Sequence, residues 1–149
     1  MIKTNLFFMA FLIFLVSSCA DDERKVVYDL GVIPQDSSVI IPVKKQLLAY
    51  NARNIEHFAP NFSDSVKLFR IGSNEAFCIG IDDLYSKYSE FFDNKQDLNC
   101  LLTNRLVCGN FVIDEELVTG LEPGREVRAV AIYEIKDSLI QNVWFIKDK

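Results

Sequence analysis

Histidine is the scarcest ionisable residue in this 149-residue chain, because only His57 is present. A catalytic or metal site that needs two imidazoles is therefore excluded. The chain also has no Cys-x-x-Cys motif and no spacing of Cys and His that is typical of a metal site. We expect no metal and no cofactor, and we interpret His57 as a solvated or packed residue near the end of a helix.

Two further features are missing: a long apolar run and an excess of positive charge. A helix that spans a bilayer needs roughly 20 apolar residues, whereas the longest run, LFFMAFLIFLV at 6–16, has eleven. The chain has 16 Lys and Arg against 21 Asp and Glu. An acidic surface does not attract phosphate backbones, so nucleic acid is not an expected partner.

The short apolar run at 6–16 follows Lys3 and is typical of a signal-peptide core. Directly after it, Val16-Ser17-Ser18-Cys19 resembles the lipobox of bacterial lipoproteins, in which the cysteine is lipidated and becomes the new N-terminus. This predicts a lipoprotein signal peptide over 1–18 and a membrane anchor at Cys19. The alternative is an ordinary secretory signal with a cysteine nearby. Loss of Lys3 would leave 15 basic against 21 acidic side chains, a net charge near −6.

The residues after the predicted anchor, Ala20-Asp21-Asp22-Glu23, resemble the acidic export tag of surface lipoproteins in the Bacteroidetes group. We therefore expect an outer-membrane lipoprotein of the cell envelope, facing either the periplasm or the cell surface. Residues 19–42 are polar at first and then mixed, and we interpret them as an acidic tether and linker.

Three cysteines remain beyond the anchor. Cys100 and Cys108 fall in one predicted strand, about 26 Å apart at about 3.3 Å per residue. A disulfide needs Cα atoms within about 7 Å, so these two cannot pair with each other. We interpret all three as small buried hydrophobes, and a disulfide between Cys78 and either of the others stays open.

Residues 43–149 are long enough for one domain with its own core. Apolar spacing predicts helices over 43–58 and 81–92, the second with acids in its first turn. Alternation and turn signals predict strands over 65–71, 76–80, 98–108, 110–119, 126–135 and 140–146. Helices followed by a long antiparallel meander indicate an α+β fold.

Four stretches of the domain resemble the nuclear-transport-factor-two-like superfamily, and within it the SnoaL-like or steroid delta-isomerase-like proteins. They are VKLFRIG, GIDDLYSKYSEFF, LNCLLTNRLVCGNFVIDEELVTG and the closing hairpin AVAIYEIKDSLIQNVWFI. The resemblance covers about residues 43–147. It implies a cone-shaped, strongly curved, mostly antiparallel sheet wrapped around N-terminal helices, with a pocket at the open end. It also implies a possible homodimer through the outer face of the sheet.

The isomerases of this superfamily use an Asp base near the end of the first strand, a helix Tyr and a protonated Asp from a late strand. In this chain the three positions fall at Arg70, Gln46 and Ala131. An arginine stays protonated and cannot abstract a proton, and an alanine side chain donates no hydrogen bond. The resemblance therefore implies a pocket from which isomerase-type catalytic residues are absent.

We expect a lipid-anchored cell-envelope protein that binds a small hydrophobic or anionic molecule in this pocket. The residues expected to contact the ligand are Gln46, Tyr50, Arg70, Tyr88 and Ala131. Arg70 can instead be an edge residue in solvent. The alternative function is an isomerase-like or cyclase-like enzyme acting on a small hydrophobic substrate, with catalytic candidates Tyr50, Tyr88 and Glu116.

An acidic run and two aromatic side chains have mainly structural interpretations. The run Asp114-Glu115-Glu116 is expected at a solvated strand end, unless one of its acids reaches the pocket as a base. Tyr133 and Trp144 lie in the last two strands, where large rings usually build a core or an interface, and we expect Trp144 in the dimer face.

Overall fold

The computed structural model describes residues 38–148. The predicted signal peptide over 1–18, the predicted lipidation site Cys19 and residues 20–37 of the predicted tether lie outside the described residues. Within 38–148, none of the helices combines the length and the apolar content that crossing a membrane requires.

The first predicted helix is in fact two helices, α1 (Ile40–Asn51) and α2 (Ile55–Phe58). The chain leaves the helical conformation at Arg53, whose φ is 51°. Asn54 then caps α2, because its side chain accepts a hydrogen bond of 3.0 Å from the backbone N–H of His57. The prediction of one continuous helix was wrong, since the helical spacing of apolar residues runs on through the break.

The third helix, α3 (Ile81–Asn94), confirms the second predicted helix and extends it by two residues. It buries Leu84 and Phe92 against the rest of the domain. Acidic side chains occupy its first turn, where they interact favourably with the positive end of the helix dipole. Asp83 also accepts a hydrogen bond of 2.9 Å from the backbone N–H of Ile79. This contact ties the start of α3 to the preceding strand.

Six strands form one sheet in the order β2-β1-β6-β5-β4-β3. The strands are β1 (Phe62–Arg70), β2 (Ala76–Ile79), β3 (Asn99–Cys108), β4 (Phe111–Glu122), β5 (Arg125–Lys136) and β6 (Leu139–Lys147). All neighbouring pairs are antiparallel except β1 and β6, which are parallel. The short 3-10 helix η1 (Ala59–Asn61) leads into β1.

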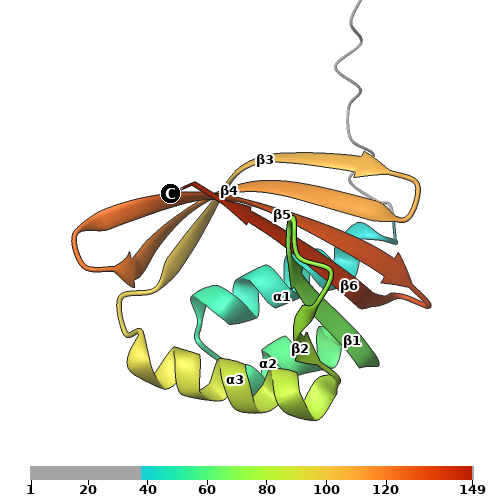
Figure 1. Ribbon diagram of the computed structural model, residues 1–149, viewed down its shortest axis with the longest axis horizontal. Helices are drawn as coiled ribbons and strands as arrows, with labels where there is room; N and C mark the ends of the chain where they lie inside the picture. The colour runs from blue at the N-terminus through green and yellow to red at the C-terminus, as the bar shows by residue number, and fades with distance from the viewer. Residues whose placement is uncertain (1–37, 149) are drawn as a thin grey trace, which may run out of the picture. The chain divides into compact units, whose positions relative to one another are not determined.

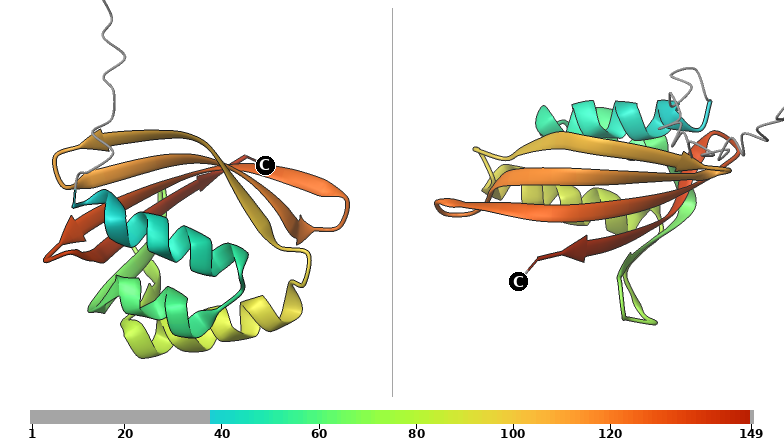
Figure 2. Two further views of the ribbon diagram at one scale, coloured as in Figure 1. Left: turned by 180° about the vertical axis from the view of Figure 1, so that it is seen from behind. Right: turned by 90° about the horizontal axis from the view of Figure 1, so that it is seen from above.

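The long strands arch over the helices, so that within residues 38–148 the sheet has a covered inner face and an uncovered outer face (Figures 1 and 2). Inward side chains such as Leu68, Val112 and Val143 are buried and join Leu84 and Phe92 in one core. The predicted α+β fold, a curved and mostly antiparallel sheet around N-terminal helices, is confirmed.

Candidate functional site

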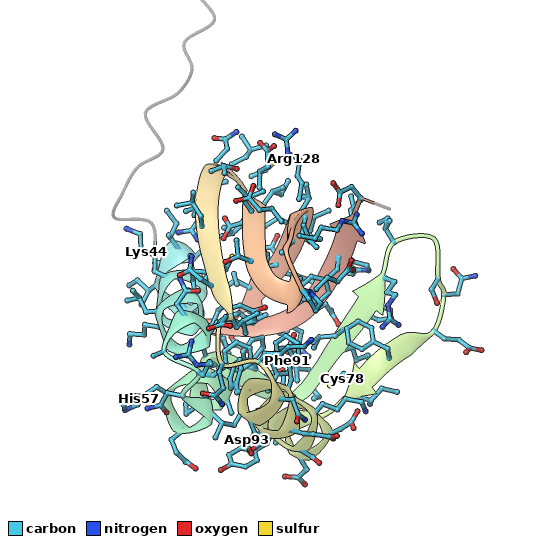
Figure 3. All side chains as sticks on the ribbon, turned by 90° about the vertical axis from the view of Figure 1, so that its left-hand side faces the viewer. Lys44, His57, Cys78, Phe91, Asp93 and Arg128 are labelled. Carbon is cyan, nitrogen blue, oxygen red and sulfur yellow. The ribbon has the colours of Figure 1, made fainter. Side chains whose placement is uncertain are left out.

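A cavity of about 560 Å³ lies between the inner face of the sheet and the helices α1 and α3. Its walls are mainly aromatic and aliphatic, as is usual for small-molecule sites. Phe91, for example, points from α3 into the space between this helix and the sheet (Figure 3). The polar lining residues are Gln46, Tyr50, Arg70, Lys87, Tyr88, Cys100, Glu116 and Tyr133.

The exposure of the lining residues separates a floor from a mouth. The buried ones, which include Gln46, Glu116 and Tyr133, form the floor. The exposed ones are Arg70, Ile71, Lys87 and Ile146, and they mark where the cavity opens to solvent. The polar groups are therefore at both ends of an apolar chamber.

Glu116 reaches the floor because of its place in the alternation of β4. Val112, Asp114, Glu116 and Val118 all face inward and are buried, with Asp114 0 % and Glu116 7 % exposed. The expectation that the acids at 114–116 lie at a solvated strand end was wrong, because β4 continues to residue 122 and the core covers this face.

Asp114 is paired with Arg105 on the neighbouring strand. The guanidinium donates two hydrogen bonds of 2.6 Å, from Nε to Oδ1 and from one terminal nitrogen to Oδ2. Both side chains are almost fully buried, so each charge needs the other. This bidentate contact matches the planar guanidinium to the two carboxylate oxygens. Arg105 therefore forms its ion pair with Asp114 and not with Glu116.

Glu116 has neutral neighbours instead of a cation of its own. The Tyr133 hydroxyl donates to Glu116 Oε1 at 3.3 Å, and Gln46 Nε2 donates to the Tyr133 hydroxyl oxygen at 3.0 Å. The Cys100 thiol also forms a hydrogen bond with Glu116. These contacts form a chain of donors from α1 through β5 to the carboxyl group.

Burial raises the pKa of Glu116 from 4.5 to about 7, and the charge of Asp114 adds to this effect. The hydrogen bonds from Tyr133 and Cys100 and the charge of Arg105 oppose it. At neutral pH this carboxyl group is thus divided between the acid and the carboxylate, which is the condition that suits a general acid or base.

Two tyrosines from the helices complete the polar lining. Tyr50 and Tyr88 pack in an aromatic cluster with Phe58, Phe91 and Phe92, at centroid separations of 4.6–6.3 Å. Burial is the main cause that raises the pKa of both phenols. They stay protonated at neutral pH and can act as hydrogen-bond donors, not as bases.

The structure brings five of the six sequence-predicted site residues to one cavity: Gln46, Tyr50, Arg70, Tyr88 and Glu116. Ala131 is fully buried on the same sheet face, but it does not line the cavity. Tyr133 was expected in the core or in a dimer face, and its contact with Glu116 was missed. The signal was available, because Tyr133 shares the inward alternation of Val127 and Ala129.

The histidine and the three cysteines within residues 38–148 do not form part of a metal-binding cluster. His57 points outward from α2 (Figure 3). Within residues 38–148 these three cysteines form no disulfide; Cys78 and Cys100 are buried as expected, whereas Cys108 is exposed, contrary to the prediction. Among residues 38–148, no group of three or more His, Cys, Asp or Glu side chains could hold a metal ion.

No protein-family model matches this chain, and no curated protein sequence matches it. Solved structures do resemble it in fold. An NTF2-like protein of unknown function from Cytophaga hutchinsonii has a TM-score of 0.61 and 12% identity, covering 74% of this chain and 89% of that chain. A candidate SnoaL-like polyketide cyclase from Jannaschia has a TM-score of 0.65 and 16% identity, covering 77% and 88%.

A third structure, a hypothetical protein with a ketosteroid isomerase-like fold from Catenulispora acidiphila, has a TM-score of 0.61 and 12% identity, covering 70% of this chain and 83% of that chain. These likenesses show that the chain has the nuclear-transport-factor-two-like fold. At such low identity they do not transfer an activity, which depends on the residues placed in the pocket.

Proposed function

We propose that this chain is a cell-envelope protein whose pocket binds a small, largely apolar molecule, and that Glu116 exchanges a proton with a polar group of that molecule. The observation that carries the proposal is a carboxyl group with a pKa of about 7 on the floor of an apolar cavity of about 560 Å³. The apolar walls supply affinity, and the few polar groups fix the orientation of the ligand. The fold, which ligand-binding and isomerase-like domains share, supports this proposal.

A cavity-filling substitution tests binding. Ala129 lines the cavity, and Val130, the next residue of β5, faces the opposite side of the sheet. We expect Ala129→Phe to weaken binding of the neutral probe 6-phenylhexan-1-ol at least about tenfold, the order expected when a ring displaces part of an apolar ligand. Val130→Phe should leave binding unchanged. Titration calorimetry measures both, and equal affinities in the two variants would contradict the proposal.

A second candidate function is proton transfer on a carbonyl substrate, as an isomerase-like or cyclase-like enzyme. The specific observation in its favour is that the Tyr133 hydroxyl lies 3.3 Å from a carboxyl group that titrates near neutral pH. In this arrangement ionised Glu116 would act as the base, held by the Tyr133 hydroxyl, and the phenols of Tyr50 and Tyr88 would donate hydrogen bonds to the carbonyl oxygen. The base would then come from β4, whereas the superfamily isomerases place it near the end of the first strand.

Turnover separates this enzyme from a binding protein. A β,γ-unsaturated cyclic ketone becomes conjugated when a base moves its α-proton, and the product absorbs in the ultraviolet. If the chain catalyses this step, Glu116→Gln should lower the rate by roughly 10² to 10⁴-fold, the usual contribution of a positioned base. A wild-type chain that binds the ketone and never isomerises it would leave binding as the function.

We further propose that Cys19 carries the lipid that holds this chain to the outer membrane, with the domain facing the periplasm or the cell surface. The lipobox-like Val16-Ser17-Ser18-Cys19 supports this. Cys19→Ala should leave the protein in the soluble fraction and without incorporated radiolabelled palmitate. Cys108→Ala, which removes an exposed cysteine of the domain, should remain in the membrane fraction. If Cys19→Ala still remains in the membrane fraction and still incorporates palmitate, the proposed anchor is wrong.

We also propose that two copies of the chain pair through the outer face of the sheet. Cross-strand register places five apolar side chains in one row across that face, and these are Leu106, Ile113, Ile132, Trp144 and Phe69. Leu106 is 56 % exposed. A continuous apolar row of this kind is typical of an interaction surface.

A further inference from the structure

The mouth of the cavity carries a cation without a matching carboxylate. Arg70 lies at the end of β1, is exposed, and lines the cavity. Its guanidinium carbon is 4.5 Å from the centroid of the Phe77 ring. Within residues 38–148, no Asp or Glu lies within ion-pair distance of it.

The aromatic ring holds the guanidinium without neutralising it. Phe77 is itself packed against Phe145, with ring centroids 6.1 Å apart, and both rings line the cavity. A guanidinium stacked on a ring face keeps its N–H donors free at the edge of its plane. Stacking therefore restricts where Arg70 can go and leaves its charge available to a ligand.

A second cation stands at the same opening. Lys87 projects from α3, lines the cavity and is exposed, although it pairs with Asp83 one turn earlier in the helix. Neither of the acids that line or back the floor can balance Arg70, because Asp114 is engaged by Arg105 and Glu116 lies on the buried floor. The chamber thus has a basic mouth, aromatic walls and an acidic floor.

We propose that the ligand of this pocket is an apolar molecule with a single terminal anionic group, a carboxylate, which binds Arg70 at the mouth while the apolar body fills the aromatic chamber. This proposal rests on the pocket-binding function proposed above and names its ligand class. A carboxylate matches the planar donor fork of Arg70. At the floor the same anion would face Glu116, and above a pH of about 7 the two like charges would repel. The orientation with the anion at the mouth follows.

Three probes of one shape test the ligand class at pH 8. They are 6-phenylhexanoate, 6-phenylhexan-1-ol and 6-phenylhexylamine, which share the apolar body and differ in end-group charge. Calorimetric titration of the full-length chain should give an affinity for the acid about tenfold above that for the alcohol, the order of a charge-assisted hydrogen bond at a partly exposed site. The amine should bind no tighter than the alcohol.

Substitutions of arginine assign the preference to one side chain. Arg70→Gln should reduce the ratio of acid to alcohol affinity to near one. Arg70→Lys should restore most of the preference, because it keeps the charge. Arg128→Gln is the matched control, since Arg128 is 72 % exposed and lies over the outer face of the sheet (Figure 3), and it should keep the wild-type ratio.

The outcomes distinguish this inference from the function on which it rests. If the wild-type chain binds acid and alcohol equally, or if Arg70→Gln and Arg128→Gln lower the ratio to the same extent, the anionic class is wrong while pocket binding stands. If the amine binds tightest, the floor carboxylate selects a cation and the proposal is overturned. If the alcohol does not bind at all, or binds undiminished to Ala129→Phe, the pocket function itself fails.

Discussion

At the scale of single residues, two acids, Asp114 and Glu116, lie on the same buried face of β4 but have different neighbours. Asp114 has a bidentate cation, Arg105, whereas Glu116 has a phenol and a thiol as neighbours. A buried carboxylate that is paired with a cation can stay ionised. Without a cation, taking up a proton lowers the free energy of the folded state. The two acids therefore suit different roles, one structural and one in the pocket.

This difference predicts how stability depends on pH. The folded state holds a proton on Glu116 up to a pH of about 7, whereas the unfolded state releases it near 4.5. The stabilisation is therefore fully present below pH 4.5 and is lost as the pH rises through 7. At about 1.4 kcal/mol per pKa unit, the free energy of unfolding should fall by about 3 kcal/mol from this group alone.

Glu116→Gln isolates this effect, because glutamine is nearly isosteric and does not titrate. Urea unfolding at pH 4 and pH 8 measures the free energy of unfolding of both proteins. The variant should gain about 3 kcal/mol relative to wild type between the two pH values. Parallel pH profiles for the two proteins would show that Glu116 does not titrate in this range.

At the scale of elements, β4 is shaped by one glycine. Gly120 has a φ of 79°, and the register of β4 with β5 shifts between Val118 and Glu122. A Cβ at this position would lie 2.4 Å from the backbone oxygen of Asp97, in the turn that follows α3. Only a residue without a side chain lets the strand pass this close to the turn.

Gly120→Ala should therefore lower the free energy of unfolding by more than about 2 kcal/mol, because strain at positive φ and a clash with backbone act together. Gly124→Ala is the matched control. Its φ is 69°, yet no heavy atom lies within 4 Å of the added Cβ, so it should cost about 1 kcal/mol from backbone strain alone. Equal losses in thermal or urea unfolding would indicate that the turn yields to the added methyl group.

The elements were largely predictable from local patterns. Alternation placed the strand boundaries within a few residues, because each strand has one face on the core and period-two burial is visible in sequence. The break between α1 and α2 was not visible, since it depends on a positive φ at Arg53, a residue type that gives no such signal. Local apolar spacing reports which side chains are buried, not where the backbone turns.

The pocket was predictable only in part, because its chemistry depends on cross-strand neighbours. Counting back from the turn after Cys108 places Arg105 opposite Asp114, so this pair could have been found. From Leu102 back to the start of β3, a register shift between Asn104 and Leu102 makes such counting wrong. The contact of Glu116 with Tyr133 and Gln46 joins β4, β5 and α1, and no local pattern in one sequence encodes the distance between three elements.

At the scale of the whole molecule, the two faces of the sheet have different roles. The inner face, with the helices, encloses the cavity, whereas the outer face is uncovered within residues 38–148 (Figure 2). On that outer face Trp144 stacks on Phe69, with ring centroids 5.7 Å apart and planes 13° apart. An apolar row left in water favours pairing with a second copy of itself.

The proposed dimer predicts that one charge on the row produces monomers. Ile132 lies beside Trp144 in the register of β5 and β6, and Ile132→Lys would bury an unpaired ammonium group in the interface. Leu48→Lys is the control, because Leu48 is 72 % exposed on α1, away from the sheet. Analytical ultracentrifugation should give a dimer for wild type and Leu48→Lys, and a monomer for Ile132→Lys.

Fluorescence provides a second readout of the same interface, since Trp144 is the single tryptophan of the chain. Burial in a dimer shifts tryptophan emission to shorter wavelength, so dilution of the wild type should move its emission to longer wavelength as dimers dissociate. Ile132→Lys should show the long-wavelength emission at every concentration. If the wild type sediments as a monomer and its emission does not depend on concentration, the proposed dimer is wrong. The pocket proposal would be unaffected, because the cavity is formed within one chain.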